Sequence, residues 1–215
     1  MKNLYCTLIL GLLGLQIACS PIKPPISNYY TLDAYSTVHL APTQSTLSIA
    51  ISQPEAMAGY QTEQMHYVQK PFELSTFVHN AWVSSPANMI YPLIMESLQK
   101  TGYFFAVVSS PYVDKADYRL DTQILALQQN FLTKPSTLEF AANIVLTHTN
   151  DNRVVASTII RQRIPCPTDT PYGGVLAANN AARAFTARVS SFVITQTKHD
   201  KHRVWGKERV AIPLK

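Results

Sequence analysis

The chain has 215 residues and a formal net charge of +5, and 47% of its residues are hydrophobic. This length favours a single domain with a core of its own. Because 14% of the residues are charged and 10% are aromatic, a disordered chain is not expected, and three cysteines are too few for a disulfide scaffold or a Cys-only zinc site.

The first residues have the pattern of an export signal that ends at a cysteine. Lys2 provides a positive charge, and residues 4–17 form an apolar stretch shorter than the ~20 residues that a helix needs to cross a bilayer. The small residue Ala18 then precedes Cys19, which resembles the bacterial lipobox. The resemblance implies a lipoprotein signal peptide over residues 1–18, cleavage between Ala18 and Cys19, and acylation of the Cys19 sulfur with a fatty acid such as palmitate. The alternative is an ordinary signal peptide that happens to end near a cysteine.

A proline-rich segment follows the cysteine. Residues 20–28 are polar and interrupted by prolines, which predicts a stiffened, lipidated tether over residues 19–28. Several acyl chains hold a protein firmly on a membrane, whereas one chain holds it marginally. We place a single folded domain at residues 29–197. Its first residues, Tyr29 and Tyr30, either pack on the edge of a sheet or form a docking strand for a partner.

Three strands are predicted before the first helix. Residues 46–52 alternate apolar and polar side chains with period two, and residues 65–68 and 72–78 are further candidates. Trp82 comes just before the helix. We expect its ring to fill the space between helix and sheet, with a partner contact as the alternative.

The first helix is marked at both ends. Ser85 is a preferred N-cap residue, Pro86 suits the first helical position, and Gly102 is a natural C-cap. The residues between them follow the spacing of one buried helix face: Ile90, Leu93, Ile94, Ser97 and Leu98. The sequence therefore predicts a helix that begins at Pro86 and ends just before Gly102.

Four strands and a second helix follow. The strands are predicted over residues 103–108, 117–128, 137–149 and 154–163, and a turn composition at 150–152 indicates an antiparallel meander. Residues 176–195 are rich in alanine and carry a helical apolar stripe. The order β-β-β-α-β-β-β-β-α predicts an α+β fold, an antiparallel sheet with two long helices packed on one face.

The excess of positive charge lies at the C-terminus. Residues 198–215 form a basic tail in which two acidic residues accompany six basic ones: Lys198, Lys201, Arg203, Lys207, Arg209 and Lys215. Such a tail can meet anionic lipid headgroups or an acidic partner, and nucleic acid is not expected as the partner of an exported protein. A solvated, frayed end is the alternative.

The sequence carries no recognisable catalytic or cofactor motif. It has no Gly-rich phosphate loop, no Gly-x-Ser-x-Gly elbow and no His-Glu-x-x-His motif. His199 and His202 flank Asp200, but a metal site is not expected in so charged a segment. Cys166 lies between two prolines, and we expect a buried thiol, with a reactive thiol or an intermolecular disulfide as the alternatives. We therefore expect no catalytic residue, no metal and no cofactor; a periplasmic hydrolase would need a clustered acid, His or Ser site.

Taken in order, these features resemble those of one protein family. A lipobox cysteine, a Tyr-Tyr-Thr-Leu segment, a first strand ending in proline, a tryptophan beside a helix start and a Tyr-Arg-Leu-Asp strand precede an alanine-rich helix. This order is similar to that of the ABC-type transport auxiliary lipoproteins. The residues that carry the resemblance are Cys19, Tyr29, Tyr30, Leu32, Ile49, Ile51, Pro54, Trp82, Leu98, Tyr118, Leu120 and the helix from Ala178 to Phe192.

The resemblance implies a non-catalytic lipoprotein that is anchored in the outer membrane by its N-terminal lipid and faces the periplasm. Ser20, rather than Asp, follows the cysteine and agrees with that location in the enteric sorting rule. The implied partner is an MCE-type periplasmic protein that works with an inner-membrane ABC permease and ATPase to move phospholipid or other hydrophobic molecules. Tyr29, Tyr30 and Trp82 are candidate partner contacts, and a homo-oligomer is left open. The alternative function is an assembly or pilot lipoprotein of a secretion system or outer-membrane translocon.

Overall fold

The structure is a computed structural model that describes residues 26–210, and the side chains of residues 26–200. The predicted signal peptide, Ala18, Cys19 and most of the tether lie outside the described residues. The strands are β1 (Asn28–Tyr30), β2 (Ser48–Ile51), β3 (Glu55–Ala56), β4 (Gln64–Val68), β5 (Ser75–Trp82), β6 (Ala106–Val108), β7 (Tyr118–Asn130), β8 (Thr137–His148) and β9 (Arg153–Pro165). The helices are α2 (Pro86–Lys100) and α3 (Pro171–Val210), with short 3₁₀ turns η1 (Ala58–Tyr60) and η2 (Val113–Lys115).

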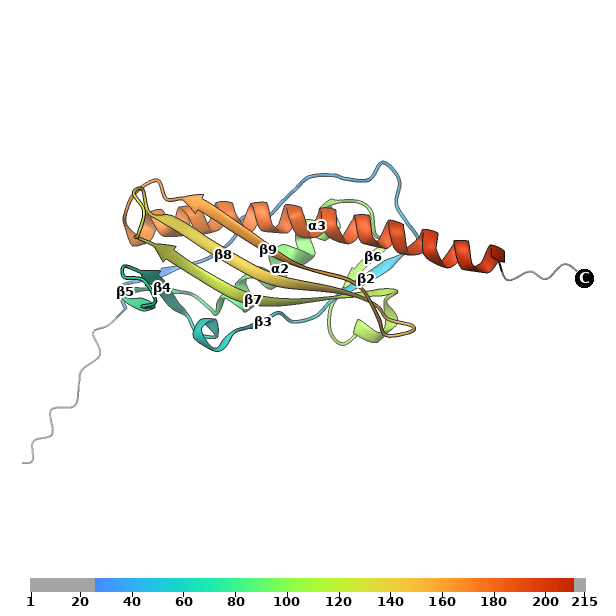
Figure 1. The fold of residues 1–215 in the computed structure, drawn as a ribbon, viewed down its shortest axis with the longest axis horizontal. Helices are drawn as coiled ribbons and strands as arrows, with labels where there is room; N and C mark the ends of the chain where they lie inside the picture. The colour runs from blue at the N-terminus through green and yellow to red at the C-terminus, as the bar shows by residue number, and fades with distance from the viewer. Residues whose placement is uncertain (1–25, 211–215) are drawn as a thin grey trace, which may run out of the picture.

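The sheet is built around the long strand β7 (Figure 1). On one side β8 pairs antiparallel with β7, and β9 pairs antiparallel with β8. On the other side β2, β3 and β4 pair with β7 one after another, and all three run parallel to it. Beyond them, β6 lies beside β2, β5 beside β4, and β1 beside β5.

The predicted α+β fold and the meander of its last three strands are confirmed, but the sheet as a whole is mixed rather than antiparallel. Strands β2 and β6 pair in parallel, and the chain between them includes α2. Parallel neighbours need a long connection of this kind, which usually contains a helix. In β2, Ile49, Ala50 and Ile51 are all fully buried, which is typical of a parallel strand covered on both faces.

The element bounds differ from the predicted ones where the pattern is short or interrupted by a turn. Strand β5 begins at Ser75, and the preceding residues, including Phe72, form a turn instead of strand. The short strands β1 and β3 carry too few residues to show a period. Helix α3 is longer than the predicted 176–195 because it starts at Pro171 and continues to Val210, so it includes the first part of the basic segment.

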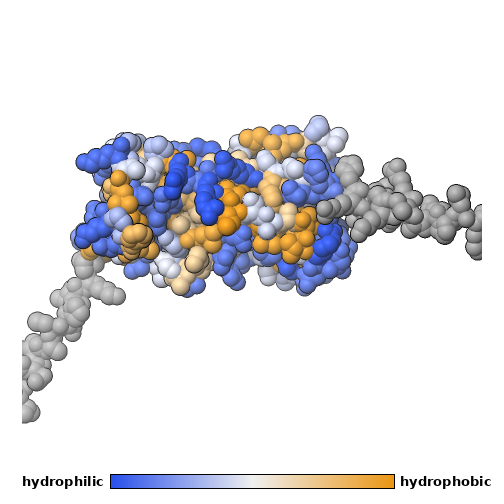
Figure 2. Space-filling view, in the orientation of Figure 1, coloured by the Kyte–Doolittle hydropathy of each residue, from blue (hydrophilic) through white to orange (hydrophobic). Residues whose placement is uncertain are grey.

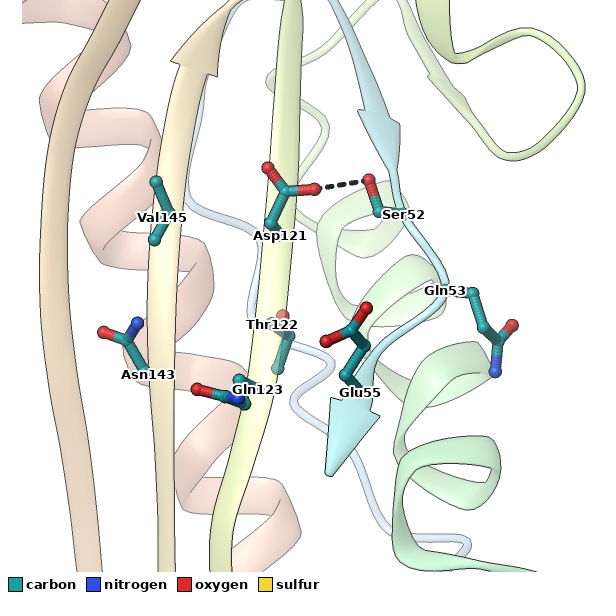
Figure 3. Close-up of a pocket in the computed structure, with 8 residues that line it drawn as sticks. All are labelled: Ser52, Gln53, Glu55, Asp121, Thr122, Gln123, Asn143 and Val145. Carbon is teal, nitrogen blue, oxygen red and sulfur yellow. Dashed lines mark hydrogen bonds between the residues drawn. The ribbon is translucent and has the colours of Figure 1, made fainter. Parts of the chain in front are cut away.

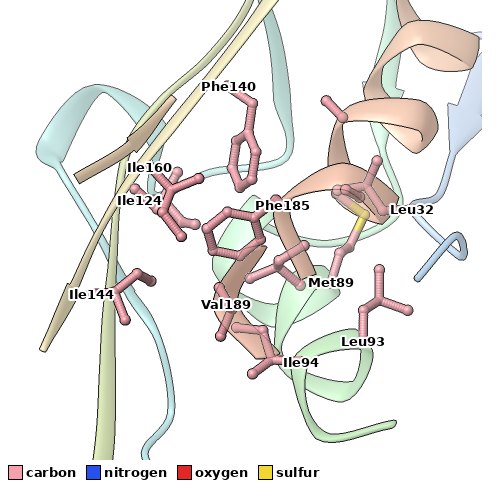
Figure 4. Close-up of a cluster of buried hydrophobic side chains, with 14 of the residues drawn as sticks. Leu32, Met89, Leu93, Ile94, Ile124, Phe140, Ile144, Ile160, Phe185 and Val189 are labelled. Carbon is pink, nitrogen blue, oxygen red and sulfur yellow. The ribbon is translucent and has the colours of Figure 1, made fainter. Parts of the chain in front are cut away.

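The core lies between the sheet and the two helices, which pack on the same face of the sheet (Figure 4). Helix α2 starts as predicted, with the Ser85 hydroxyl accepting a hydrogen bond from the Asn88 N–H, and it ends before Gly102, whose φ of +69° suits glycine. From α3, Phe185 is fully buried and its ring centre lies 4.8 Å from that of Phe140 on β8. This packing fixes α3 across the meander.

A strap between β1 and β2 crosses the helices. The Asn179 side chain on α3 accepts hydrogen bonds from the N–H groups of Asp33 (2.9 Å) and Ala34 (3.2 Å), and it donates to the Thr31 carbonyl. Further along the strap, the Ser36 N–H donates to the Thr186 hydroxyl at 2.9 Å. The start of the domain is thereby held against α3.

Cys166 follows β9 and is buried, as expected from its place between prolines. Its N–H donates to the Ser136 carbonyl at 2.7 Å, and burial raises the pKa of its thiol. A raised thiol pKa disfavours the reactive thiolate.

At the end of the sheet where β7 begins, a buried polar cluster joins α3 to β7 and β9. Asp200 on α3 is 3% exposed, accepts a hydrogen bond from the Tyr118 hydroxyl at 3.1 Å, and receives one from the Arg153 guanidinium at 3.0 Å. Burial, followed by the nearby Asp200 charge, raises the pKa of Tyr118. Asp151 lies beside this cluster and is exposed. Hydrogen bonds from His148 and Arg153 hold its pKa at about 2.

We expect Asp200→Ala to lower the free energy of unfolding by roughly 2 kcal/mol, because the buried Tyr118 hydroxyl loses its acceptor and Arg153 keeps only one of its two carboxylate partners, Asp151. The Arg153 side chain is 38% exposed and stays partly hydrated, which limits the loss. Urea denaturation measures the difference. In the control, Asp200→Asn, an acceptor for Tyr118 remains, so a smaller loss is expected; equal losses would show that the hydrogen bond contributes nothing.

Candidate functional site

The β1 edge of the sheet holds the two tyrosines that were predicted as partner contacts. β1 runs parallel to β5, with Tyr29 opposite Ala81 and Tyr30 opposite Trp82. Since successive side chains of a strand point to opposite faces, the two tyrosines differ in environment. Tyr29 is 61% exposed, whereas Tyr30 is half-buried and its hydroxyl lies 3.3 Å from the Asn80 side-chain oxygen, to which it donates.

Helix α3 adds apolar surface on the inner side of this edge. The ring centre of Tyr172, in the first turn of α3, lies 6.0 Å from that of Tyr30. Tyr172 is 55% exposed, and Leu176 one turn later is 41% exposed. The prolines and glycines between β9 and residue 175 concealed the first turn of α3, so Tyr172 lies before the predicted helix, and Leu176, its first predicted residue, was not predicted to be part of this surface.

Trp82 lies in the core and not on the surface. It is 2% exposed and belongs to the buried cluster between sheet and helices. Its burial agrees with the structural interpretation of this residue, and its ring is not part of the surface that a partner could reach. The accessible aromatic residue of the β1 edge is Tyr29.

A second candidate is a polar groove on the face of the sheet that the helices leave open (Figure 3). It has a volume of about 360 Å³ and is lined by Ser52, Gln53, Glu55, Asp121, Thr122, Gln123, Asn143 and Val145. The Ser52 hydroxyl donates to Asp121 at 2.6 Å, and the Arg119 Nε donates to the other carboxylate oxygen at 3.1 Å. No histidine or lysine is among the lining residues, and the Asp121 carboxylate that accepts from Ser52 is also held by Arg119. The groove can hydrogen-bond a polar group.

The remaining chemistry-bearing side chains do not converge. Within residues 26–200, no three His, Cys, Asp or Glu side chains lie close enough together to hold a metal ion. His202 falls beyond the described side chains, so the His199–His202 pair is not placed. In the same part of the chain, no helix is both long enough and apolar enough to cross a membrane.

The surface is mixed in character. On the face seen in Figure 2, hydrophobic residues form several separate patches among hydrophilic ones. No single apolar area covers that face, so an interaction site has to be argued from individual exposed side chains.

The comparisons with known proteins agree with the sequence resemblance. A family model described as ABC-type transport auxiliary lipoprotein component matches residues 30–190. No curated protein is similar enough to match the chain. The match includes the last residue of β1, all of α2, the whole meander and the first half of α3.

Two solved structures share the fold. The crystal structure of protein XCC0632 from Xanthomonas campestris, of the family DUF330, has a TM-score of 0.73 at 17% identity and covers 81% of this chain and 99% of that one. The crystal structure of an uncharacterized protein has a TM-score of 0.63 at 12% identity and covers 78% of this chain and 98% of that one. At these identities the likeness shows the fold alone.

Proposed function

The chain belongs to the family of ABC-type transport auxiliary lipoproteins, and on that premise we propose that it is a non-catalytic outer-membrane lipoprotein of an MCE-containing system that moves lipids between membranes. The family match over residues 30–190 is the observation that carries the proposal. Membership indicates an accessory component of an ABC-type transport system. It also indicates a membrane-associated lipoprotein in the periplasm. The MCE partner, the outer membrane and the lipid cargo are the proposed refinements.

The position of the first described residues supports an anchored role. The Ser27 N–H donates to the His79 carbonyl, so the chain joins the sheet along β5. Six residues lie between Cys19 and Ile26, and the seven residue steps that join them span at most about 25 Å when extended. An acylated Cys19 would therefore keep this end of the domain close to the membrane. Figure 1 shows that α3 leaves the sheet at the opposite end.

The β1 edge is the surface that we propose for the transporter partner. β1 ends the path of the sheet, so its outer side can accept another strand or an apolar segment. Tyr29 provides an exposed aromatic side chain on one face of this edge, and Tyr172 provides one on the other. Aromatic side chains of this kind dominate the free energy of many protein interfaces.

The function is tested by isolating the tagged lipoprotein from detergent extracts of the native membranes. Co-purification of an MCE protein together with an ABC permease and ATPase would support the proposal. Consistent recovery of secretion-system or translocon subunits in their place would support the pilot-lipoprotein alternative and contradict the transport role.

We expect Tyr29→Asp to weaken recovery of the transporter partner roughly tenfold, because it places a charge at the centre of the proposed contact. The melting temperature should not change, since Tyr29 is 61% exposed. Tyr112→Asp is the matched control, because Tyr112 is 55% exposed and precedes η2 at the other end of β7. Equal recovery by both variants would show that the β1 edge is not the partner surface.

A further inference from the structure

The turn between β4 and β5 has an aromatic residue at a position that ordinarily takes glycine. The Glu73 N–H donates to the Lys70 carbonyl, which closes a four-residue turn with Pro71 and Phe72 in the middle. Proline fixes φ near −65° at the first central position, and Phe72 has φ of +67° at the second. This combination is a type II turn, whose second central residue is normally Gly or Asn.

Phe72 gains no contact within the domain in return for this conformation. Its relative exposure is 107%, so the ring extends entirely into the surroundings of the fold. A bulky residue at positive φ is strained, and an exposed phenyl ring is unfavourable in water. Neither feature stabilises the isolated domain, which indicates that the ring meets something outside it.

Two more apolar side chains lie close to this turn. Leu74 directly follows the turn and is 44% exposed, and Leu132, in the loop between β7 and β8, is 48% exposed. The two loops are held together because the Phe131 N–H donates to the Val68 carbonyl at 2.8 Å. Beneath them, the rings of Tyr67, Phe77 and Phe131 pack with centres 4.6 to 6.3 Å apart. We refer to Phe72, Leu74 and Leu132 as the apolar tip.

The apolar tip lies at the end of the domain where the N-terminal segment joins it. β1 runs parallel to β5, and β5 begins directly after the turn. Ser27 continues this pairing, since its N–H donates to the His79 carbonyl, so the first described residues lie on the side of β1 that is nearer the tip. The short segment between Cys19 and Ile26 therefore connects the predicted acylation site to this end. The same membrane that holds the acyl chains is the apolar phase within reach of the tip.

We propose that the apolar tip inserts into the interface of the membrane that carries the Cys19 acyl chains, and so fixes the orientation of the domain on that membrane. The inference rests on the lipid anchor of the proposed function and does not depend on the identity of the transporter partner. An anchor through a proline-rich tether alone would limit the distance of the domain from the membrane but would leave the domain free to rotate. A second contact, formed by side chains on two packed loops, would also fix the orientation of the domain.

Charge contributes little to this contact. Lys70 and Glu73 form an exposed ion pair at 3.6 Å. In the neighbouring loop, hydrogen bonds from Ser136 and, to a smaller extent, the charge of Lys134 lower the pKa of the Asp169 carboxyl. Because the basic groups near the tip have acidic neighbours, insertion is driven by the apolar side chains. It should therefore persist at high salt, where electrostatic attraction to anionic lipid is screened.

The test uses tryptophan as a depth reporter in the full lipidated chain. Phe72→Trp and Leu132→Trp are reconstituted in phosphatidylethanolamine and phosphatidylglycerol vesicles whose acyl chains carry bromine, and the unsubstituted protein supplies the background of Trp82 and Trp205. Bromine quenches nearby indoles, so we expect the added emission to fall by about half at both positions, as for side chains placed 5–10 Å into the interface. Phe105→Trp is the control, since Phe105 is 70% exposed near the start of β2, away from the tip, and should not be quenched.

The outcomes separate the tip from the anchor. If the protein floats with the vesicles while the added emission of Phe72→Trp and Leu132→Trp is quenched no more than that of Phe105→Trp, the insertion is overturned and the anchor stands. A blue-shifted but unquenched emission would assign the tip to a protein contact and would also overturn the insertion. Failure of the unsubstituted protein to float would remove the anchor and this inference together, whereas quenching at both tip positions supports it whatever transporter co-purifies.

Discussion

Replacing Cys19 with serine is expected to abolish fatty-acid labelling of the chain and to leave a slower-migrating precursor that retains residues 1–18. The predicted linkage is to the cysteine sulfur, and serine offers no thiol to the acylating step. Because cleavage follows acylation in the lipobox pathway that the sequence resembles, the leader should remain uncut. Labelling with a fatty-acid analogue and mass spectrometry of the N-terminus measure both changes.

Cys166→Ser is the matched control for this prediction. Cys166 is 2% exposed, and nothing in its surroundings offers access to an acylating enzyme, so that variant should keep its label. If an ordinary signal peptide is present instead, Cys19→Ser will be processed normally and the native protein will carry no fatty acid. A free, unacylated first residue on the mature protein would contradict the anchor and, with it, the proposed insertion of the apolar tip.

The parts of the fold that could be predicted are those whose periodicity is local. The strands β7, β8 and β9 are 12 or 13 residues long and alternate for most of their length, and α2 carries capping residues at both ends. The parallel pairing of β2 with β7 depends on contacts between residues about 70 positions apart, which no local pattern reports. The predicted antiparallel direction was therefore right for the meander and for the pairing of β4 with β5, and wrong for the strands that pair with β7 on its other side.

The candidate site was predicted in part for similar reasons. Tyr29 and Tyr30 were singled out by their place after the tether, and the structure puts them on the sheet edge. The apolar tip was missed because Phe72 was assigned to a strand. Pro71 was the available signal, since proline favours the first central position of a turn, but the glycine or asparagine that normally completes a type II turn is absent.

Phe185→Ala is expected to lower the free energy of unfolding by about 3–5 kcal/mol, which is the usual range for removing a buried phenyl ring and leaving a cavity. Phe185 is fully buried between α3 and the sheet, with Phe140, Ile94 and Val189 around it (Figure 4). Since most domains have only about 5–15 kcal/mol of stability, the variant should unfold at a much lower urea concentration. Phe185→Leu keeps most of the volume and should lose roughly 1–2 kcal/mol. Equal losses for alanine and leucine would contradict the cavity explanation.

The two sites on α3 also test whether the helix is held as one unit. Phe185 and Asp200 are fifteen residues apart, which is about 22 Å along a helix, and they contact different strands. Independent sites at that separation give additive losses within about 0.5 kcal/mol. In the double variant Phe185→Leu with Asp200→Ala, additivity would mean that the core and the polar cluster fix α3 separately. A combined loss well below the sum would mean that loosening the helix at Phe185 already releases Asp200 from Tyr118 and Arg153, so that the far half of α3 depends on the near half for its position.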